Sequence, residues 1–508
     1  MTTIRPTALS GTFRDSGARH VRRARVQCPR GDISGAHTPD VSGGSGSARE
    51  TTLHLLVLCV LALLCFGTDA ASAREFPEIL DLRRLPQEPL LYLSGNPATC
   101  LVDEEVQKEK AQAFLEKHFA PWKRTAPAHT VEDLLWPFKA YGNREGFGEN
   151  LRLRSPNWVA AMRTNVREEA FGSLNRPAVA LQETSLRLFP TDKPFFLDSD
   201  MAGEGYPFDY LQNSAVKPGE ALFVSHASAD GAWFFCETAY AAGWVDVRHL
   251  AFVDAAFMER WQRGPWLVVC RNTVSVALFQ PGDEPGTFRF TAPLGTLLPV
   301  AGDPLLGAFR FVNIPVRNEN GMAALHRGVL PEGAAAPWPL PFTGWNAARL
   351  AGEVMGEPYG WGGLLQNRDC SATTRDLLAP FGVWLPRNSA AQAKSGTWFP
   401  LEGLPVAEKK ARLLAEGLPF RTLVALRGHI MLYIGSWRGE PVVLHTTWGV
   451  RTLKDGREGR HVIGKTVITT LTPGAELPDL HPSGTIGERI TGFTVLSPQQ
   501  SEGGKTAP

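Results

Sequence analysis

Two successive stretches of short, alternating apolar runs set the strongest limit on the fold of this chain. The first spans residues 178 to 253 and contains runs such as "ALFVSHAS" and "AWFFCETAY" between Gly, Asp and Pro turns. The second spans residues 264 to 330 and has the same texture. Alternation with a period of two is typical of half-buried strands, and frequent turns favour small antiparallel barrels. We therefore expect two small β-barrels of about 70 residues each, which repeat an architecture without repeating a sequence.

Helical patterns precede the barrels, and a mixed pattern follows them. The run 102 to 122 opens with acidic residues and closes with Lys and His before Pro121, which suits both ends of a helix dipole. Ser155 and Pro156 open a second helical run as N-cap and first helical residue. The proline-rich stretch 330 to 344 is expected to be a semi-rigid linker, with an α+β domain beyond it. A chain of 508 residues is expected to form several domains, because a single hydrophobic core stops growing at roughly 300 residues.

The run "LHLLVLCVLALLCF" at residues 53 to 66 indicates an exported protein. It is shorter than the ~20 apolar residues that span a bilayer, so no stable membrane span is expected. Ala71 and Ala73 form the small-x-small pattern that a signal peptidase accepts. Residues 1 to 73 are therefore interpreted as a cleavable signal peptide with an upstream extension from a start codon placed too early. The mature protein would be periplasmic or secreted. A lipid anchor at Cys65 is less favoured, because two leucines precede it where small residues are expected.

Composition excludes several partners. The formal net charge is +1 at pH 7, so no basic field would recruit nucleic acid or an anionic membrane. Four cysteines follow the apolar run: Cys100, Cys236, Cys270 and Cys370. They are too few for a disulfide scaffold and form no C-x-x-C pair, so at most one bridge among the first three is expected. We expect no cofactor, and a monomer is preferred.

The stretch "YGWGGLLQNRDCSATTRDLL", residues 359 to 378, carries the strongest sign of chemistry. Asp369 can cap a helix that runs from Cys370 to about Ala379, where a Pro and a Gly end it. The thiol would lie in the first turn, where free N–H groups and the helix dipole stabilise a thiolate and lower the thiol pKa below ~8.5. The pattern therefore favours a nucleophilic cysteine.

Two histidines in neighbouring predicted strands could serve that nucleophile. "GHIMLYIGSW" carries His429 and "PVVLHTTW" carries His445. The two histidines share a face of the sheet only if each residue of one strand opposes a residue of the other whose number gives an even sum with its own. A three-residue loop at 437 to 439 would produce this register, and His445 would then oppose Met431. A two-residue loop would place them on opposite faces. Because a thiolate needs a base and the base needs an orienting partner, Cys370, His429 and His445 form a candidate catalytic set.

The same three side chains also fit purely structural roles or a metal site. A lone Cys is more often a small buried apolar residue, and a strand His is often only a polar side chain of the surface or core. The three side chains could hold zinc, but their spacing matches no compact zinc finger. We therefore expect no metal.

The stretch "PYGWGG…DCSATT…GHIMLYIG…VVLH" resembles the NlpC-type family of papain-like bacterial cell-wall peptidases, whose motifs occur in this order. The resemblance covers about residues 340 to 480, and the preceding region is similar to an arrangement of a helical stabilising segment and two bacterial SH3-like domains. It implies an α+β multidomain fold, with a papain-like domain preceded by two small SH3-like β-barrels and a helical segment. The expected bounds are 1–73 for the signal region, 74–177 for the helical segment, 178–262 and 263–335 for the barrels, 336–490 for the peptidase domain and 491–508 for a disordered tail.

The resemblance implies a γ-D-glutamyl-L-diamino acid endopeptidase, which cuts the amide between the D-Glu side chain and the diamino acid, diaminopimelate, of peptidoglycan stem peptides or muropeptides. By this resemblance Cys370 is the nucleophile, His429 the base and His445 the partner that orients it. The Cys370 backbone N–H and the Tyr359 hydroxyl would meet the oxyanion. The alternatives are a related amidase that cuts the glycan-to-L-Ala bond and a non-catalytic wall-binding protein.

The substrate-binding residues implied by the resemblance include one departure. Relatives that trim short muropeptides use a P-R-D-S stretch, whose Asp and Ser meet the free amino end of L-Ala. This chain has "LPRNSAAQ", with Asn where the Asp stands. An amide cannot pair with an ammonium as a carboxylate does, so the expectation of a free L-Ala amine is weakened. The candidate substrate-binding residues are Tyr210, Trp361, Asp369, Ser371, Asn388 and Ser389.

Overall fold

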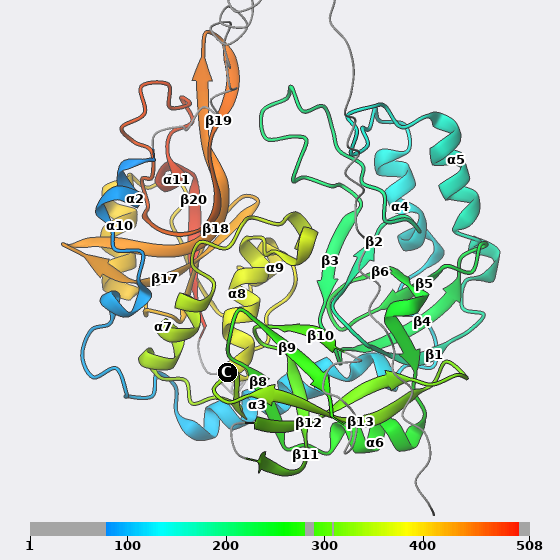
Figure 1. The fold of residues 1–508 in the computed structure, drawn as a ribbon. Coiled ribbons are helices and arrows are strands. Elements are labelled where there is room, and N and C mark those ends of the chain that lie inside the picture. Colours follow the sequence, from blue (N-terminus) through cyan, green and yellow to red (C-terminus); the bar gives the residue numbers. More distant parts are fainter. Residues whose placement is uncertain (1–77, 280–288, 307–308, 497–508) are drawn as a thin grey trace, which may run out of the picture. The chain divides into compact units, whose positions relative to one another are not determined.

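The computed structural model describes residues 78–279, 289–306 and 309–496. The expected signal region at 1–73 lies outside the described residues, and so does the stretch 497–508. An N-terminal group of helices is followed by three antiparallel sheets (Figure 1). This order confirms the predicted α+β multidomain class, with a helical segment, two β-domains and a C-terminal α+β domain.

The N-terminal segment consists of short helices. Ser155 caps one of them by accepting a hydrogen bond from the Trp158 N–H, as its position before a proline predicts. Asp81 lies apart from this group, since its side chain accepts the Thr470 N–H of the third sheet at 2.7 Å. The elements are α2 (Leu80–Arg84), η1 (Pro89–Tyr92), α3 (Glu104–His118), η2 (Ala120–Lys123), α4 (Val131–Tyr141), α5 (Pro156–Asn165) and η3 (Glu168–Ala170).

The first β-domain is a seven-stranded antiparallel sheet with the order β3-β2-β6-β5-β4-β1-β7. Buried and partly buried residues alternate along β3, as expected of a strand with one face on the core. The elements are β1 (Arg176–Ala180), β2 (Thr184–Arg187), β3 (Gln212–Val216), β4 (Ala221–Ala227), β5 (Trp233–Glu237), β6 (Ala242–Asp246), η4 (Val247–His249), β7 (Leu250–Phe252) and α6 (Ala255–Gln262).

The second β-domain has the order β10-β9-β13-β12-β11-β8-β14. Its strands are β8 (Trp266–Val269), β9 (Thr273–Leu278), β10 (Arg289–Pro293), β11 (Leu297–Leu306), β12 (Phe309–Arg317), β13 (Ala323–Pro331) and β14 (Ala335–Trp338). The last of these corrects a prediction, because the proline-rich stretch is not a linker. Strand β14 pairs with β8 at the edge of the sheet, where Pro337 can lack an N–H donor at little cost. The domain therefore extends past the predicted boundary at 335.

The third sheet has the order β15-β20-β16-β17-β18-β19. Its strands are β15 (Thr397–Pro400), β16 (Thr422–Leu426), β17 (His429–Trp437), β18 (Glu440–Lys454), β19 (Arg457–Thr470) and β20 (Ile490–Val495). The helices of this domain are α7 (Gly344–Glu353), η5 (Trp361–Gln366), α8 (Cys370–Leu378), η6 (Ala379–Phe381), α9 (Ser389–Gln392), α10 (Val406–Glu416) and α11 (Ile486–Arg489). The predicted tail at 491–508 is wrong in its first part, because β20 pairs with both β15 and β16 and buries Phe493.

Helix α8 begins at the predicted residue and is held by apolar contacts and by buried ion pairs. Its Leu377 belongs to the same core as Leu432 of β17. Its Asp376 lies 2.7 Å from Nζ of Lys217 and 2.9 Å from Nε of Arg368. Because Lys217 belongs to the first barrel, this buried cluster fixes α8 relative to that barrel.

Further contacts connect the same region to both barrels. Nη2 of Arg375 lies 3.2 Å from Glu220 of the first barrel, and its guanidinium stacks on the Tyr240 ring at 3.6 Å from the centroid. Nη1 of Arg368 donates to the Asn272 side chain of the second barrel at 2.6 Å. Both barrels therefore contact the segment that carries the candidate cysteine, which lies near the centre of the view in Figure 1.

We expect Asp376→Asn to lower the free energy of unfolding by about 3 to 5 kcal/mol at pH 7, because Lys217 and Arg368 would be left buried beside a neutral group. Burial alone would raise the pKa of Asp376, but Lys217, Arg368 and Arg375 lower it to about 2. The folded-state pKa therefore lies below the unfolded value of 3.8, so this stabilisation is present above about pH 4 and is lost as the pH falls toward 2. Urea unfolding at pH 7 and at pH 3 measures both effects.

Glu259→Gln is the matched control. Glu259 pairs with Arg263 on the exposed surface, where an ion pair contributes less than about 1 kcal/mol. Equal losses of stability in the two variants would contradict the importance given to the buried cluster.

Candidate active site

Cys370 occupies the first turn of α8, where Asp369 caps the helix by accepting the Ala372 N–H at 2.8 Å. It is 8% exposed and lines a cavity of about 500 Å³. Burial, and next the negative charge of Asp369, raise the pKa of Cys370 to about 12, while the backbone N–H groups of Ile430 and Ser371 act in the opposite direction. The predicted lowering of the thiol pKa is therefore wrong for the resting site, because burial outweighs the helix terminus.

His429 and His445 contact each other directly, with Nε2 of His429 2.8 Å from Nδ1 of His445. Nε2 of His445 lies 3.1 Å from the Thr469 hydroxyl, which donates its own proton to the Thr470 carbonyl at 2.8 Å. The hydroxyl must then accept a hydrogen bond from the Nε2–H group of His445, which leaves Nδ1 of His445 to accept one from the Nε2–H group of His429. Nδ1 of His429 is left as the nitrogen without a proton.

The two histidines share a face of the sheet for a reason that the sequence did not show. The turn between β17 and β18 contains only Arg438 and Gly439, both in the left-handed region with φ of 52° and 84°. A two-residue turn alone would place the histidines on opposite faces. A β-bulge before Gly435 shifts the register by one residue, and beyond it Leu432 opposes Leu444. That pairing is the even-sum register required to bring the histidines together.

The thiol of Cys370 lies at the start of β17. The Ile430 N–H that hydrogen-bonds the thiol belongs to the residue after His429. Burial, and next the positive charge of Arg489, lower the pKa of His429 to about 4, whereas Asp369 raises it. Burial thus disfavours a charge on the thiol or on the imidazole alone. A thiolate paired with a protonated His429 would carry no net charge and would therefore cost less than either charge alone.

Aromatic side chains form the next part of the cavity wall. Tyr359 and Trp361 line the cavity with Cys370. Burial, with help from nearby negative charges, raises the pKa of Tyr359, so its hydroxyl keeps a proton that it can donate. Phe208 of the first barrel packs edge-on against Trp361 at 5.4 Å and Trp448 of β18 at 5.5 Å. The long loop between β2 and β3 is therefore docked onto the C-terminal domain.

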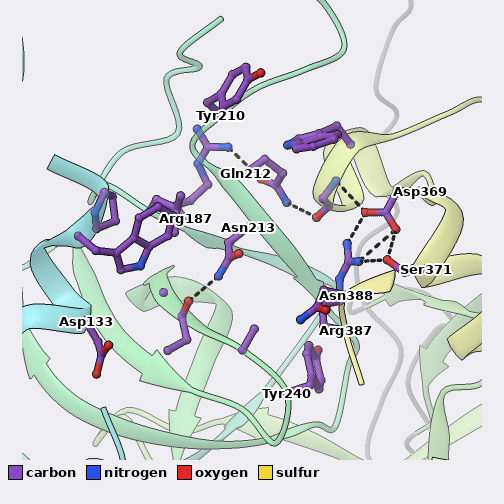
Figure 2. A pocket seen from close by; sticks show the side chains of 18 of the residues that line it. Asp133, Arg187, Tyr210, Gln212, Asn213, Tyr240, Asp369, Ser371, Arg387 and Asn388 are labelled. Carbon is purple, nitrogen blue, oxygen red and sulfur yellow. Dashed lines mark hydrogen bonds and ion pairs between the residues drawn. The ribbon is translucent and has the colours of Figure 1, made fainter. Parts of the chain in front are cut away.

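Arg387, which the sequence analysis did not single out, holds two predicted substrate-binding residues. Its guanidinium donates to both carboxylate oxygens of Asp369, at 3.0 and 2.7 Å, and to the Ser371 hydroxyl at 2.9 Å (Figure 2). Its Nε donates to the Ser214 hydroxyl of the first barrel at 2.8 Å. Asp369 and Ser371 line the cavity, but their polar atoms are engaged within the protein. The signal that could have found Arg387 was its place in the "LPRNSAAQ" stretch.

The remaining predicted residues also line the cavity. Asn388 and Ser389 open α9, and the Asn388 side-chain oxygen accepts the Ala391 N–H at 2.8 Å. The Tyr210 hydroxyl donates to the Glu204 carboxylate at 2.9 Å. Apart from the two histidines, all the predicted site residues line this one cavity.

The far wall of the cavity comes from residues that are distant in the sequence. The first barrel contributes Asn213 and Tyr240, and helix α4 contributes Asp133 and Trp136. Figure 2 shows Asn213, Tyr240 and Arg387 around the same space. No local pattern marks these residues, because only the docking of the barrel and the helical segment brings them near Cys370.

Within residues 78–279, 289–306 and 309–496, no group of three His, Cys, Asp or Glu side chains is placed to hold a metal ion. The four cysteines in those ranges are free thiols. No helix of the described part is both long and apolar enough to cross a bilayer.

Comparisons with known proteins identify the family. Residues 356–456 match the NlpC/P60 family, and residues 55–171 match the N-terminal stabilising domain associated with it. Residues 194–246 match an SH3 domain of the SH3b1 type, and residues 254–303 match one of the SH3b2 type. Residues 356–456 are thus similar to the NlpC/P60 family, and two stretches similar to SH3 domains precede them.

Two relatives illustrate the extent of the similarity. A probable endopeptidase of Corynebacterium glutamicum is 34% identical over 85 residues, which are 16% of this chain and 41% of that protein. The match therefore spans less than half the length of that relative. The solved structure of an NlpC/P60 endopeptidase from Photobacterium damselae subsp. piscicida has a TM-score of 0.73 at 23% identity and covers 83% of this chain and 98% of that one. At this identity the likeness shows that the fold is shared.

We expect nitrogen-15 NMR of histidine-labelled protein to find His429 neutral above about pH 5, with its proton on Nε2, because its pKa is lowered to about 4. Thr469→Val removes the hydroxyl that sets the tautomer of His445, so both rings should then show mixed tautomers. Thr469→Ser keeps the hydroxyl and should preserve the single tautomer. Titration of His429 near pH 6.5, or an unchanged tautomer in Thr469→Val, would contradict the hydrogen-bond assignment.

Proposed function

We propose that this protein is a cysteine endopeptidase that hydrolyses the amide between the side-chain carboxyl of D-Glu and the L-diamino acid, diaminopimelate, of peptidoglycan stem peptides or muropeptides. The observation that carries the proposal is that the thiol of Cys370, in the first turn of α8, hydrogen-bonds the backbone N–H of Ile430, the residue after His429. His429 in turn contacts His445, which leaves Nδ1 of His429 without a proton. The match of residues 356–456 to the NlpC/P60 family and the similarity to a probable endopeptidase support peptidase activity.

In the proposed first half-reaction, Sγ of Cys370 attacks the γ-carbonyl carbon of D-Glu while the thiol proton passes to Nδ1 of His429. The carbonyl electron pair moves onto oxygen, which accepts hydrogen bonds from the Cys370 N–H and the Tyr359 hydroxyl. The carbon–nitrogen bond then breaks, and His429 gives its proton to the departing amine. The acyl group stays on sulfur as a thioester.

In the second half-reaction, water attacks the thioester and gives a proton to His429. The carbon–sulfur bond breaks, the D-Glu carboxyl is released, and the proton returns to the thiol. Nδ1 of His445 accepts a hydrogen bond from the Nε2–H group of His429 throughout and stabilises the imidazolium that forms in each half. Thr469 keeps His445 in the tautomer that allows this.

The charges in the cavity support a stem peptide whose first amine is blocked. Two carboxylates line the cavity, and both are engaged. Asp369 pairs with Arg387, and Asp133 accepts the Thr130 N–H and hydroxyl, each at 2.9 Å. Asn388 is neutral and uses its oxygen to cap α9. A free ammonium would find no carboxylate at position 388, whereas an acylated nitrogen, as in a peptide still attached to the glycan, brings no charge and needs none.

This substrate lies outside the cytoplasm, and the apolar run at 53 to 66 supports export to the periplasm or the medium. We therefore propose that the protein acts there after removal of a signal peptide. The expectation of a monomer stays a prediction.

We expect the full chain to release diaminopimelate from L-Ala-γ-D-Glu-diaminopimelate and Cys370→Ala to release none, because no other group can form the thioester. Mass spectrometry of the products measures the release, and circular dichroism checks that the variant is folded. A new amine on L-Ala in digests of intact sacculi would instead identify the amidase. Turnover retained by Cys370→Ala would refute the nucleophile.

We expect the N-acetylated tripeptide to have a kcat/KM at least about tenfold above that of the free-amine peptide at pH 7, because position 388 offers the ammonium a neutral amide and no carboxylate. The ratio should shrink as the pH rises past ~8, where the amine loses its charge. Asn388→Asp is the informative variant, since a carboxylate there should favour the free-amine peptide. A preference of the unmodified protein for the free amine at pH 7 would count against a blocked substrate.

A further inference from the structure

Three arginines, Arg451, Arg460 and Arg489, gather near the end of the third sheet that carries His429, and none of them lines the cavity. Arg489 directly precedes Ile490, the first residue of β20, which pairs with Leu426 of β16. Leu426 in turn pairs with His429. Adjacent strands lie about 4.8 Å apart, so the Arg489 backbone lies about 10 Å from that of His429. A long side chain can cover much of that distance.

Arg451 of β18 and Arg460 of β19 stand directly opposite each other in their hairpin. Like charges in this position repel, so the pair is destabilising unless an anion lies between them. Glu458 is the carboxylate of the described residues within ion-pair distance of both, at 2.9 Å from Arg451 and 3.9 Å from Arg460. It also lies 3.4 Å from His481. One carboxylate is therefore shared between two arginines and a histidine nitrogen, and Nε of Arg451 is buried without a partner.

A turn connects this pair to Arg489. The Ser483 hydroxyl accepts from Arg451 at 3.4 Å, and the Thr485 carbonyl accepts from Nε of Arg489 at 3.3 Å. Both hydrogen bonds are long and therefore weak. Glu488 directly precedes Arg489 in the sequence, but its carboxylate accepts a hydrogen bond from the Thr485 hydroxyl. No carboxylate of the described ranges lies within 4 Å of the Arg489 guanidinium. Burial, and next the charges of the other two arginines, lower the pKa of Arg489, which indicates positive charge that is not neutralised.

The position of this cluster fits the leaving group. In the proposed reaction His429 protonates the departing amine, so the diamino acid must lie beside His429 while the acyl part occupies the cavity. Arg489 is the cation whose charge acts on His429. The first barrel borders the cluster, since a Cβ atom added at Gly203 would lie 3.2 Å from Nε of Arg460.

We propose that Arg489, with Arg451 and Arg460 beside it, binds the carboxylates of the leaving diamino acid. The inference rests on the proposed function. Diaminopimelate carries one carboxylate beside the scissile nitrogen and a second at the far end of its side chain, whereas lysine carries only the first. A guanidinium pairs with a carboxylate through two parallel hydrogen bonds. The cluster therefore selects diaminopimelate over lysine and over diaminopimelate whose far carboxyl is amidated.

The test is steady-state kinetics of the full chain and of Arg489→Gln on two tripeptides that differ only in diaminopimelate or lysine at the third position. For the diaminopimelate peptide we expect KM to rise about ten- to a hundredfold, the effect of a lost charge-assisted hydrogen bond, with a much smaller change in kcat. The lysine peptide should change far less. Arg457→Gln is the matched control, because Arg457 is an exposed arginine of the same hairpin.

Arg489→Lys keeps a positive charge but loses the planar guanidinium, so its KM for the diaminopimelate peptide should rise less than that of Arg489→Gln. This variant replaces Arg489→Gln if the latter does not fold. An equal loss on both peptides, or an unchanged KM for diaminopimelate in a folded variant, would overturn the inference. If the unmodified protein cleaves neither peptide, the proposed function fails and this inference fails with it.

Discussion

The carboxylate of Asp369 receives hydrogen bonds from three segments of the chain that meet at the thiol. It caps α8 through the Ala372 N–H, accepts the Gly362 N–H of η5 at 3.1 Å and pairs with Arg387 just before α9. Each of these segments lines the cavity, so the position of Cys370 and the shape of its surroundings depend on one buried charge pair. Such a pair is costly to break, because either partner left alone would be an unpaired buried charge.

The first barrel forms part of the cavity wall beside Cys370. Gly362 has a φ of 61°, and a side chain there would collide with the Gln212 carbonyl of the first barrel. Glycine is therefore required both by the backbone conformation and by the close approach of β3. The same barrel supplies Asn213 and Tyr240 to the cavity, and ion pairs from Lys217 hold it against α8. Substrate selection can then change through barrel residues without any change in the reacting groups.

Much of the fold could be predicted from local patterns. The Asp369 cap, the start of α8 and the helix that begins after Ser155 follow from rules that act within a few residues. Features that depend on partners far along the chain could not be predicted. The proline-rich stretch forms strand β14 because Pro337 lies at the edge of its sheet, where it needs no N–H donor. Residues 490–495 form strand β20 because they pair with β15 and β16.

The candidate site shows the same division. The sequence singled out the cysteine and both histidines, but a bulge before Gly435 that no pattern marked sets their shared face. The helix terminus suggested an acidic thiol, yet burial raises the pKa of Cys370. Arg387 directly precedes the predicted Asn388, but its role depends on Asp369 and Ser214, which are distant in the sequence.

The central claim is that one sulfur carries the acyl group during turnover. Rapid acid quenching of the full chain with the tripeptide, followed by intact-mass and peptide-level mass spectrometry, tests it most directly. The account predicts a transient adduct with the mass of L-Ala-γ-D-Glu, less water, on the peptide that contains Cys370. Product formation without that adduct under conditions where hydrolysis of the thioester is slow, or an adduct on another residue, would contradict it.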